Sequence, residues 1–218
     1  MAKKQKKHWI KRIFSYVVIV LILIIGLGLV FNSQIESFWL GMQSNQKVSS
    51  ISKNEVKKGE KKQGNYDFSN VKSVSGNAIT ESEKARKENA IGKITIPALK
   101  INLPIFKGLD SENLTIGAGT MKADQKMGQG NYVLAGHHMK DPNVLFSPLA
   151  KAKEGQLIKL SNASKTYKYK ISKVKVVPET DVSVINDVPG KKELTLVTCA
   201  SGNPGETRRI IVTADLEK

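Results

Sequence analysis

The sequence predicts a mainly β protein, a closed eight-stranded β-barrel with short helices that is preceded by an N-terminal transmembrane helix. Residues 14–31 form an apolar run of eighteen residues without a charge. From residue 90 onward, short apolar runs recur between turn residues, a pattern typical of a protein with many short strands. Among them, residues 167–176 alternate between apolar positions and positions that are mostly lysine, as expected of a long, half-buried antiparallel strand.

The apolar run is long enough to cross a bilayer. Eighteen helical residues span about 27 Å, close to the roughly 30 Å of a hydrocarbon core. A cleaved signal peptide is the competing interpretation, but the run is longer than the usual signal core and no small-x-small cleavage site follows it. Basic residues precede the run, which places the N-terminus in the cytoplasm. We therefore expect a single-pass cell-membrane protein with a cytoplasmic segment at 1–12, an anchor at 13–31 and an extracytoplasmic remainder.

The remainder divides at about residue 90. Residues 32–89 are polar and rich in Lys, Ser, Asn and Gly, which predicts a stalk with, at most, a short solvated helix at 81–89. Residues 90–218 form the predicted β-barrel domain. Its expected helices are 110–116 and 145–152, and its expected strands are 91–96, 102–106, 132–135, 156–160, 166–177, 194–198 and 209–214.

The formal net charge is +16, and much of it lies in the first dozen residues and near residue 60. No basic run in the C-terminal half is interleaved with aromatic residues, so no nucleic-acid partner is expected. Attraction to the membrane surface and the cell envelope explains the charge more simply.

Three chemically active groups lie at the ends of predicted strands. Cys199, the single cysteine, follows the run 194–198, and His137 follows 132–136. A lone cysteine is either buried and inert or a reactive thiol. A nearby imidazole favours the second, because a thiolate can attack a peptide carbonyl while the imidazole protonates the leaving amine. Arg208 or Arg209, which start the last strand, would stabilise the developing oxyanion.

Other interpretations of these residues are weaker. His137 and His138 are neighbours on a strand and point to opposite faces, and there is no second cysteine, so no metal site is expected. Either arginine alone could belong to a surface strand edge.

The motifs AGHH at 135–138, LTLVTC at 194–199 and RRIIV at 208–212 resemble the His, Cys and Arg motifs of class A sortases, the LPXTG transpeptidases of Gram-positive bacteria. The similarity extends over residues 90–218 and includes GAGTM at 117–121 and GNYVLAGHH at 130–138. An N-terminal anchor without a C-terminal span also fits class A.

The resemblance implies a sortase-type barrel and a two-step reaction. The enzyme would cleave an LPXTG sorting signal between Thr and Gly through a thioacyl-enzyme on Cys199, and pass the surface protein to lipid II or a peptidoglycan cross-bridge amine. His137 would be the general acid and base and Arg209 the carbonyl stabiliser, although the staphylococcal pattern favours Arg208. The implied lining of the signal groove is Ala135, Val182, Val184, Ile185, Thr195 and Val197.

The resemblance also leads to an expectation about calcium. Positions that would match the acidic calcium ligands of the staphylococcal enzyme are Lys122, Gln125 and Gln129, and only Asp187 matches a carboxylate. One carboxylate beside a lysine cannot supply the six to eight oxygens that calcium prefers. We therefore expect no cofactor and activity that is independent of calcium.

Two alternatives from other classes stay open at this point. The domain could be a non-enzymatic module that binds an anionic wall polymer, or a cysteine endopeptidase that releases its product to water.

Overall fold

The computed structural model describes residues 2–30, 53–67 and 90–217, which belong to two units, residues 1–36 and residues 37–218. The first unit contains helix α1 (Ala2–Val30). Its described side chains between Phe14 and Leu27 are mostly apolar and exposed. Within the described ranges, no helix combines the length and the apolar character needed to cross a membrane.

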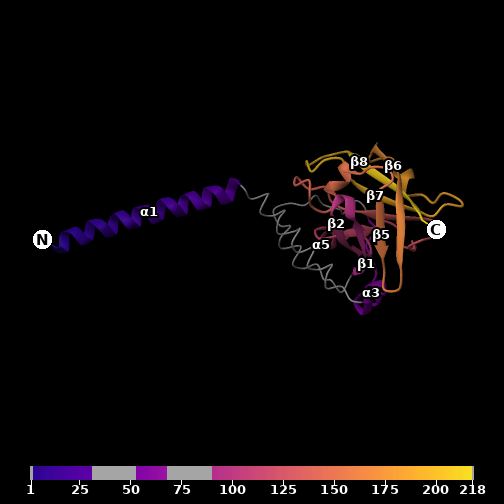
Figure 1. The fold of residues 1–218 in the computed structure, drawn as a ribbon, viewed down its shortest axis with the longest axis horizontal. Coiled ribbons are helices and arrows are strands. Elements are labelled where there is room, and N and C mark those ends of the chain that lie inside the picture. The colour runs from indigo at the N-terminus through magenta and orange to yellow at the C-terminus, as the bar shows by residue number, and fades with distance from the viewer. Residues whose placement is uncertain (1, 31–52, 68–89, 218) are drawn as a thin grey trace. The chain divides into compact units, whose positions relative to one another are not determined.

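The second unit is built around a closed β-barrel (Figure 1). Around the barrel the strands follow the order β1-β2-β3-β4-β7-β8-β6-β5, and closure leaves no exposed sheet edge. The predicted mainly β barrel is therefore confirmed. Its strands are β1 (Ala90–Ile96), β2 (Ile101–Phe106), β3 (Ala118–Thr120), β4 (Asn131–Ala135), β5 (Leu157–Ser161), β6 (Thr166–Pro178), β7 (Glu193–Cys199) and β8 (Arg208–Leu216).

The helices of this domain are short. Helix α5 (Ser111–Leu114) and the 3-10 helix η4 (Ser147–Lys151) lie within the two predicted helical segments. Two further 3-10 turns were not predicted, η3 (Pro97–Leu99) and η5 (Val182–Ile185). Strand β3 was also missed, because three residues are too few to show a period.

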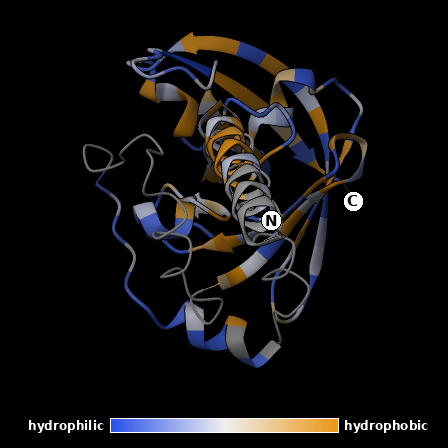
Figure 2. Cartoon of the chain, turned by 90° about the vertical axis from the view of Figure 1, so that its left-hand side faces the viewer, coloured by the Kyte–Doolittle hydropathy of each residue, from blue (hydrophilic) through white to orange (hydrophobic). Residues whose placement is uncertain are grey.

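Side chains that alternate along the strands fill the barrel interior. Figure 2 shows hydrophobic and hydrophilic residues alternating along several strands. On β7, Leu194 and Leu196 are fully buried in the main core cluster, where they meet Leu134 of β4. Thr195, which lies between them, points to the opposite face, as the period of two requires.

Strand β6 departs from the strict alternation that its sequence suggests. Tyr169 and Ile171 are buried, but the pairing with β8 shifts its register between Ile171 and Lys173. A β-bulge of this kind inserts one extra residue, so beyond it the even-numbered residues face the barrel interior. Val174 packs against the main core cluster, and Val177 is buried on the opposite face, where it packs with Val197 and Ile211.

Part of the region predicted as a stalk is structured. Helix α3 (Lys53–Glu60) packs against β1, and its Val56 is buried. The chain that follows it reaches the loop after β2, where the backbone N–H of Leu109 donates to the carbonyl of Asn65 at 2.6 Å. The rest of the predicted stalk, including the expected helix at 81–89, lies outside the described residues.

The contact between this segment and the barrel can be tested at Gly108, which has φ +81°. A Cβ there would lie 2.5 Å from the backbone nitrogen of Asn65, whereas Gly190, at φ +78°, has nothing within 4 Å. Both substitutions to alanine carry the strain of a left-handed backbone, but only Gly108→Ala also displaces the packed segment. We expect Gly108→Ala to lower the free energy of unfolding by about 3 kcal/mol and Gly190→Ala by about 1 kcal/mol. Urea denaturation measures both, and equal losses would contradict the packing of residues 60–67 on the barrel.

Candidate active site

Two strand pairings bring the chemically active side chains together. Strands β4 and β7 are parallel neighbours, with Ala135 opposite Val197. Strands β7 and β8 are antiparallel neighbours, with Cys199 opposite Arg209. Because parallel strands end at the same edge, the chain leaving β4 reaches the level of Cys199 two residues after Ala135, at His137.

Hydrogen bonds extend the pairing beyond the end of β4. The Gly136 N–H donates to the Val197 carbonyl at 3.1 Å, and the Thr198 hydroxyl donates to the Gly136 carbonyl at 2.8 Å. These contacts hold His137 beside Cys199. The two residues and Arg209 therefore form one row across three adjacent strands, with neighbouring strands about 4.8 Å apart.

The backbone around the two histidines is tightly packed. A Cβ on Gly136 would lie 2.7 Å from the ring of Phe146, so only glycine fits there. The Phe146 N–H in turn donates to the His137 carbonyl at 3.0 Å. His138 turns the other way, and its Nδ1 donates to the carbonyl of Cys199 at 2.7 Å.

A groove of about 720 Å³ lies in front of this row of side chains. Its floor includes Val177, Val197 and Ile211, which pack together on the outer face of the barrel. Its wall comes from the loop between β6 and β7. Of the residues predicted from the sequence, those that line it are Ala135, His137, Val182, Val184, Ile185, Val197, Cys199 and Arg209.

Thr195 is the exception among the predicted groove residues. It lies on the same face of β7 as Val197, but it is 1% exposed and does not line the groove. Its hydroxyl donates to the side-chain oxygen of Asn131 at 2.8 Å. The amide of Asn131 donates to the carbonyls of Val184 and Asn186, so the loop covers Thr195.

The structure distinguishes the two arginines. Arg209 lines the groove, and its Nη2 contacts a carboxylate oxygen of Glu179 at 2.5 Å. Arg208 does not line the groove, and its Nε pairs with a carboxylate oxygen of Glu206 at 3.0 Å. This bond, followed by the Ser201 hydroxyl, lowers the pKa of Glu206 to about 2. Arg208 therefore braces the loop between β7 and β8, and Arg209 is the arginine that lines the groove.

The environment of the histidine favours its neutral form. His137 is half-buried, and desolvation lowers its pKa from 6.5 to about 4. Cys199 is also half-buried and is a free thiol. A neutral imidazole beside a thiol can accept its proton, which is the first requirement of a Cys-His nucleophile.

An ion pair ties together two loops near the groove. The Lys122 ammonium lies 2.7 Å from a carboxylate oxygen of Asp187, which also accepts the Asn131 N–H at 2.8 Å. These two hydrogen bonds lower the pKa of Asp187, the lysine contributing most. Among the described residues, no group of three or more His, Cys, Asp or Glu side chains is arranged to hold a metal ion.

Sequence reasoning missed several contributors to this site. Glu179 follows the last residue of β6, and only the pairing of β6 with β8 brings it to Arg209. Leu109 and Leu114 line the groove from the chain after β2, and no local motif marks them. The position of Glu179, immediately after a long predicted strand, was the one feature of the sequence that could have indicated a role at the site.

Comparisons with known proteins agree with this geometry. The family model described as "Sortase domain" matches residues 94–217. Sortase A of Streptococcus agalactiae is 45% identical over 225 residues, which cover 100% of this chain and 90% of that protein. Sortase A of Listeria monocytogenes is 37% identical, covering 91% of this chain and 90% of that protein.

Solved structures show the same fold. The crystal structure of Listeria monocytogenes sortase A superposes with a TM-score of 0.57 at 42% identity and covers 59% of this chain and 88% of that one. The Clostridium perfringens sortase D5 transpeptidase gives a TM-score of 0.53 at 26% identity, with 64% and 88% covered.

The lowered pKa of His137 predicts how stability depends on pH. Between pH 6.5 and about 4 the unfolded chain binds a proton on this imidazole and the folded chain does not. Stability is therefore intact above pH 6.5 and falls as the pH drops toward 4, and His137→Gln should lack this part of the loss. Urea denaturation at pH 7 and pH 5 measures it, and NMR titration of the His137 ring should give a midpoint near 4. A ring that titrates at 6.5 would contradict the prediction.

Proposed function

The chain belongs to the sortase family, and we propose that it is a cysteine transpeptidase that cleaves LPXTG-type sorting signals between Thr and Gly and attaches surface proteins to a cell-wall amine. The observation that supports this most is the row His137–Cys199–Arg209 at the mouth of an apolar groove. It supplies a base, a nucleophile and a cation side by side on neighbouring strands.

The groove suits the apolar part of such a signal. Valine and isoleucine side chains of the strands and of η5 offer surfaces on which Leu and Pro can be buried, at about 25 cal/mol per Å² of apolar area. A signal lying along them would bring its Thr carbonyl toward Cys199. The polar end of the groove, where Glu179 and Glu206 lie, faces the Thr-Gly bond.

In the first half-reaction the thiol of Cys199 transfers its proton to neutral His137, and the thiolate attacks the Thr carbonyl carbon. The Arg209 guanidinium hydrogen-bonds the carbonyl oxygen as it becomes negative. The C–N bond then breaks, His137 gives its proton to the departing Gly amine, and the acyl group remains on sulfur as a thioester.

In the second half-reaction an amine of the wall precursor, lipid II or a peptidoglycan cross-bridge, attacks the thioester. His137 accepts the amine's proton and returns it to the sulfur as the C–S bond breaks. The acyl group is thereby transferred to a new amide, and the free thiol is regenerated.

The predicted anchor agrees with this function. We propose that residues 13–31 hold the protein in the cell membrane with its N-terminus in the cytoplasm and the barrel outside. The uncharged run at 14–31 and the basic residues before it support this. Separation of cells into membrane and soluble fractions tests it, and a full chain found in the soluble fraction would contradict it.

The activity should need no calcium. We propose that the Lys122 ammonium takes the place of a bound cation between the two loops, because it already pairs with Asp187. Gln125 is not free to bind a cation either, because its side-chain amide hydrogen-bonds the backbone of Val133. We expect the rate of peptide cleavage to be the same, within about twofold, in calcium and in excess chelator. Stimulation by calcium of several-fold that a chelator abolishes would contradict this.

The central test is acylation. Incubation of the full chain in detergent with an LPXTG peptide should give a mass increase equal to the acyl fragment, carried on Cys199. Cys199→Ala should give no adduct and no cleavage. Arg209→Ala should slow acylation by about 10²–10³-fold, the loss typical of a missing oxyanion donor.

Arg208→Ala is the matched control for Arg209→Ala, because it removes the same charge one residue away and should leave the rate within about threefold. Equal losses in the two variants would contradict the assigned role of Arg209. Cleavage that continues in Cys199→Ala would overturn the enzyme proposal, and a peptide-binding function alone would survive that substitution. Addition of a glycine-type amine should divert the product into a new amide, whereas an endopeptidase would release only the acid.

A further inference from the structure

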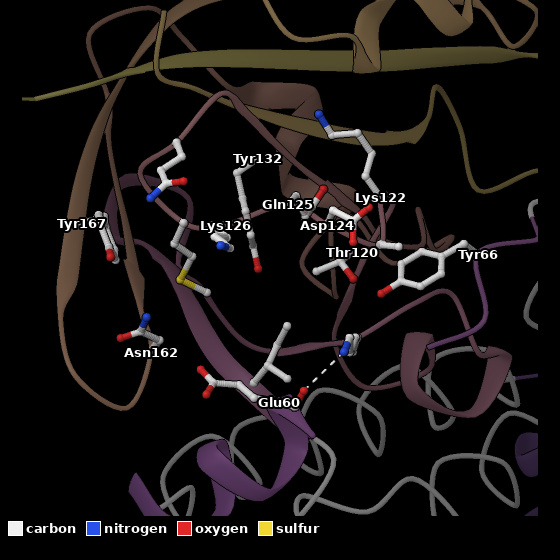
Figure 3. A pocket seen from close by; sticks show the side chains of 15 residues that line it. Glu60, Tyr66, Thr120, Lys122, Asp124, Gln125, Lys126, Tyr132, Asn162 and Tyr167 are labelled. Carbon is white, nitrogen blue, oxygen red and sulfur yellow. Dashed lines mark hydrogen bonds between the residues drawn. The ribbon is translucent and has the colours of Figure 1, made fainter. Parts of the chain in front are cut away.

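A second cavity of about 650 Å³ lies in the domain and shares no lining residue with the groove at Cys199 (Figure 3). Several parts of the chain that are distant in sequence form it. They include the segment after α3 with Tyr66, the chain after β2 with Lys107, the loop between β3 and β4 with Lys126, and the hairpin of β5 and β6 with Asn162. None of these residues takes part in the proposed transpeptidation.

The hydroxyl of Tyr66 has no partner. Its oxygen is buried, and among the described residues it is the one buried side-chain polar atom without a hydrogen bond. Figure 3 shows the hydroxyl pointing toward the interior of the cavity. A buried, unpaired hydroxyl is destabilising, and native proteins rarely keep one without a use. A ligand atom in the cavity would satisfy it.

The lysines of the cavity are available for an anion. Lys107 donates to the neutral carbonyl of Glu60 at 3.2 Å, so that contact leaves its charge uncompensated. Lys126 is exposed, and its ammonium group has no hydrogen bond or ion pair with any residue that the structure describes. Lys122 differs, because Asp187 already neutralises it.

The remaining polar groups suit a ligand rich in hydroxyls. The carboxylates of Glu60 and Asp124 line the cavity with the amides of Gln129 and Asn162. Carboxylates accept hydrogen bonds from hydroxyl groups, and amides both donate and accept. Tyrosine side chains add apolar ring surface next to a hydroxyl. The groove at Cys199 is lined mainly by aliphatic side chains and has a different character.

We propose that this cavity binds an acidic saccharide, a sugar unit that carries a carboxylate or a phosphate. Lys107 and Lys126 bind the acidic group, because the ammonium of a lysine attracts a carboxylate or a phosphate as a point charge. The hydroxyl of Tyr66 and the amides of Gln129 and Asn162 hydrogen-bond the sugar hydroxyls. The volume lies in the range of ordinary small-molecule sites.

Calorimetric titration of the full chain in detergent tests the proposal with three probes. N-Acetylmuramic acid carries a carboxylate, N-acetylglucosamine 6-phosphate carries a phosphate, and N-acetylglucosamine is the neutral control. At least one acidic probe should bind saturably and about tenfold more tightly than the neutral sugar, and the stronger of the two identifies the acidic group. Equal binding of all three, or no saturation at millimolar concentration, would overturn the proposal.

Two lysine variants localise the binding. Lys126→Gln should lower the affinity for the acidic probe about five- to tenfold and leave the affinity for the neutral sugar unchanged. Lys173→Gln, which removes an exposed lysine of β6 outside the cavity, should change neither. Equal losses in the two variants would mean that the acidic probe responds only to net charge, and the assigned site would be wrong.

Tyr66→Phe separates a ligand site from a structural role. Because the hydroxyl is unpaired, its removal should leave the melting temperature of the empty protein unchanged or raise it by about 2–4 °C. The same variant should bind the acidic probe about three- to tenfold more weakly. A lower melting temperature with intact binding would overturn the proposal.

The outcome does not depend on the proposed transpeptidation. Cys199→Ala should bind the saccharide with unchanged affinity, and Lys126→Gln should acylate at the rate of the unchanged chain. Failure of the unchanged chain to form the acyl adduct would count against the proposed function only. Failure to bind the saccharide would count against this site only.

Discussion

The parallel pairing of β4 with β7 is the constraint on which the rest of the site depends. Parallel strands in register end at the same edge, so Ala135 opposite Val197 carries the chain on to His137 at the level of Cys199. The antiparallel neighbour β8 begins at that same edge, which puts Arg209 opposite Cys199. A slip of one residue would turn the thiol toward the barrel interior, because the side-chain period of a strand is two. The buried leucines of β7 hold the register of the strand, so packing in the core determines where Cys199 lies relative to His137 and Arg209.

The same alternation explains what the sequence could and could not predict. Cys199 and His137 follow apolar runs directly, and a local pattern is enough to place them at strand ends. Arg209 could not be separated from Arg208 by pattern alone, because the choice depends on which face of β8 each residue occupies and on Glu206. Thr195 was predicted to line the groove, and it does lie on the same face of β7 as Val197. Asn131 and the loop between β6 and β7 cover it, however. That covering is a long-range contact with no local signature.

The N-terminal segment shows where composition misleads. Its polar, lysine-rich sequence predicts a stalk, because apolar residues occur singly. Yet the buried Val56 and a backbone hydrogen bond are enough to pack residues 53–67 against the folded barrel. Ordering a short segment against an existing surface needs far less apolar burial than forming a core of its own. The bulge in β6 was missed for a related reason, since one inserted residue changes the phase of a pattern without removing it.

The loop between β3 and β4 connects the two cavities physically. Met121 lines the groove at Cys199, and the next residue, Lys122, lines the second cavity. Lys122 also holds Asp187, whose loop carries the aliphatic wall of the groove, so one ion pair belongs to both surroundings. Both side chains are partly exposed, so this ion pair is weak. The β3–β4 loop therefore joins the groove beside His137, Cys199 and Arg209, whose positions follow from strand register, to the second, polar cavity.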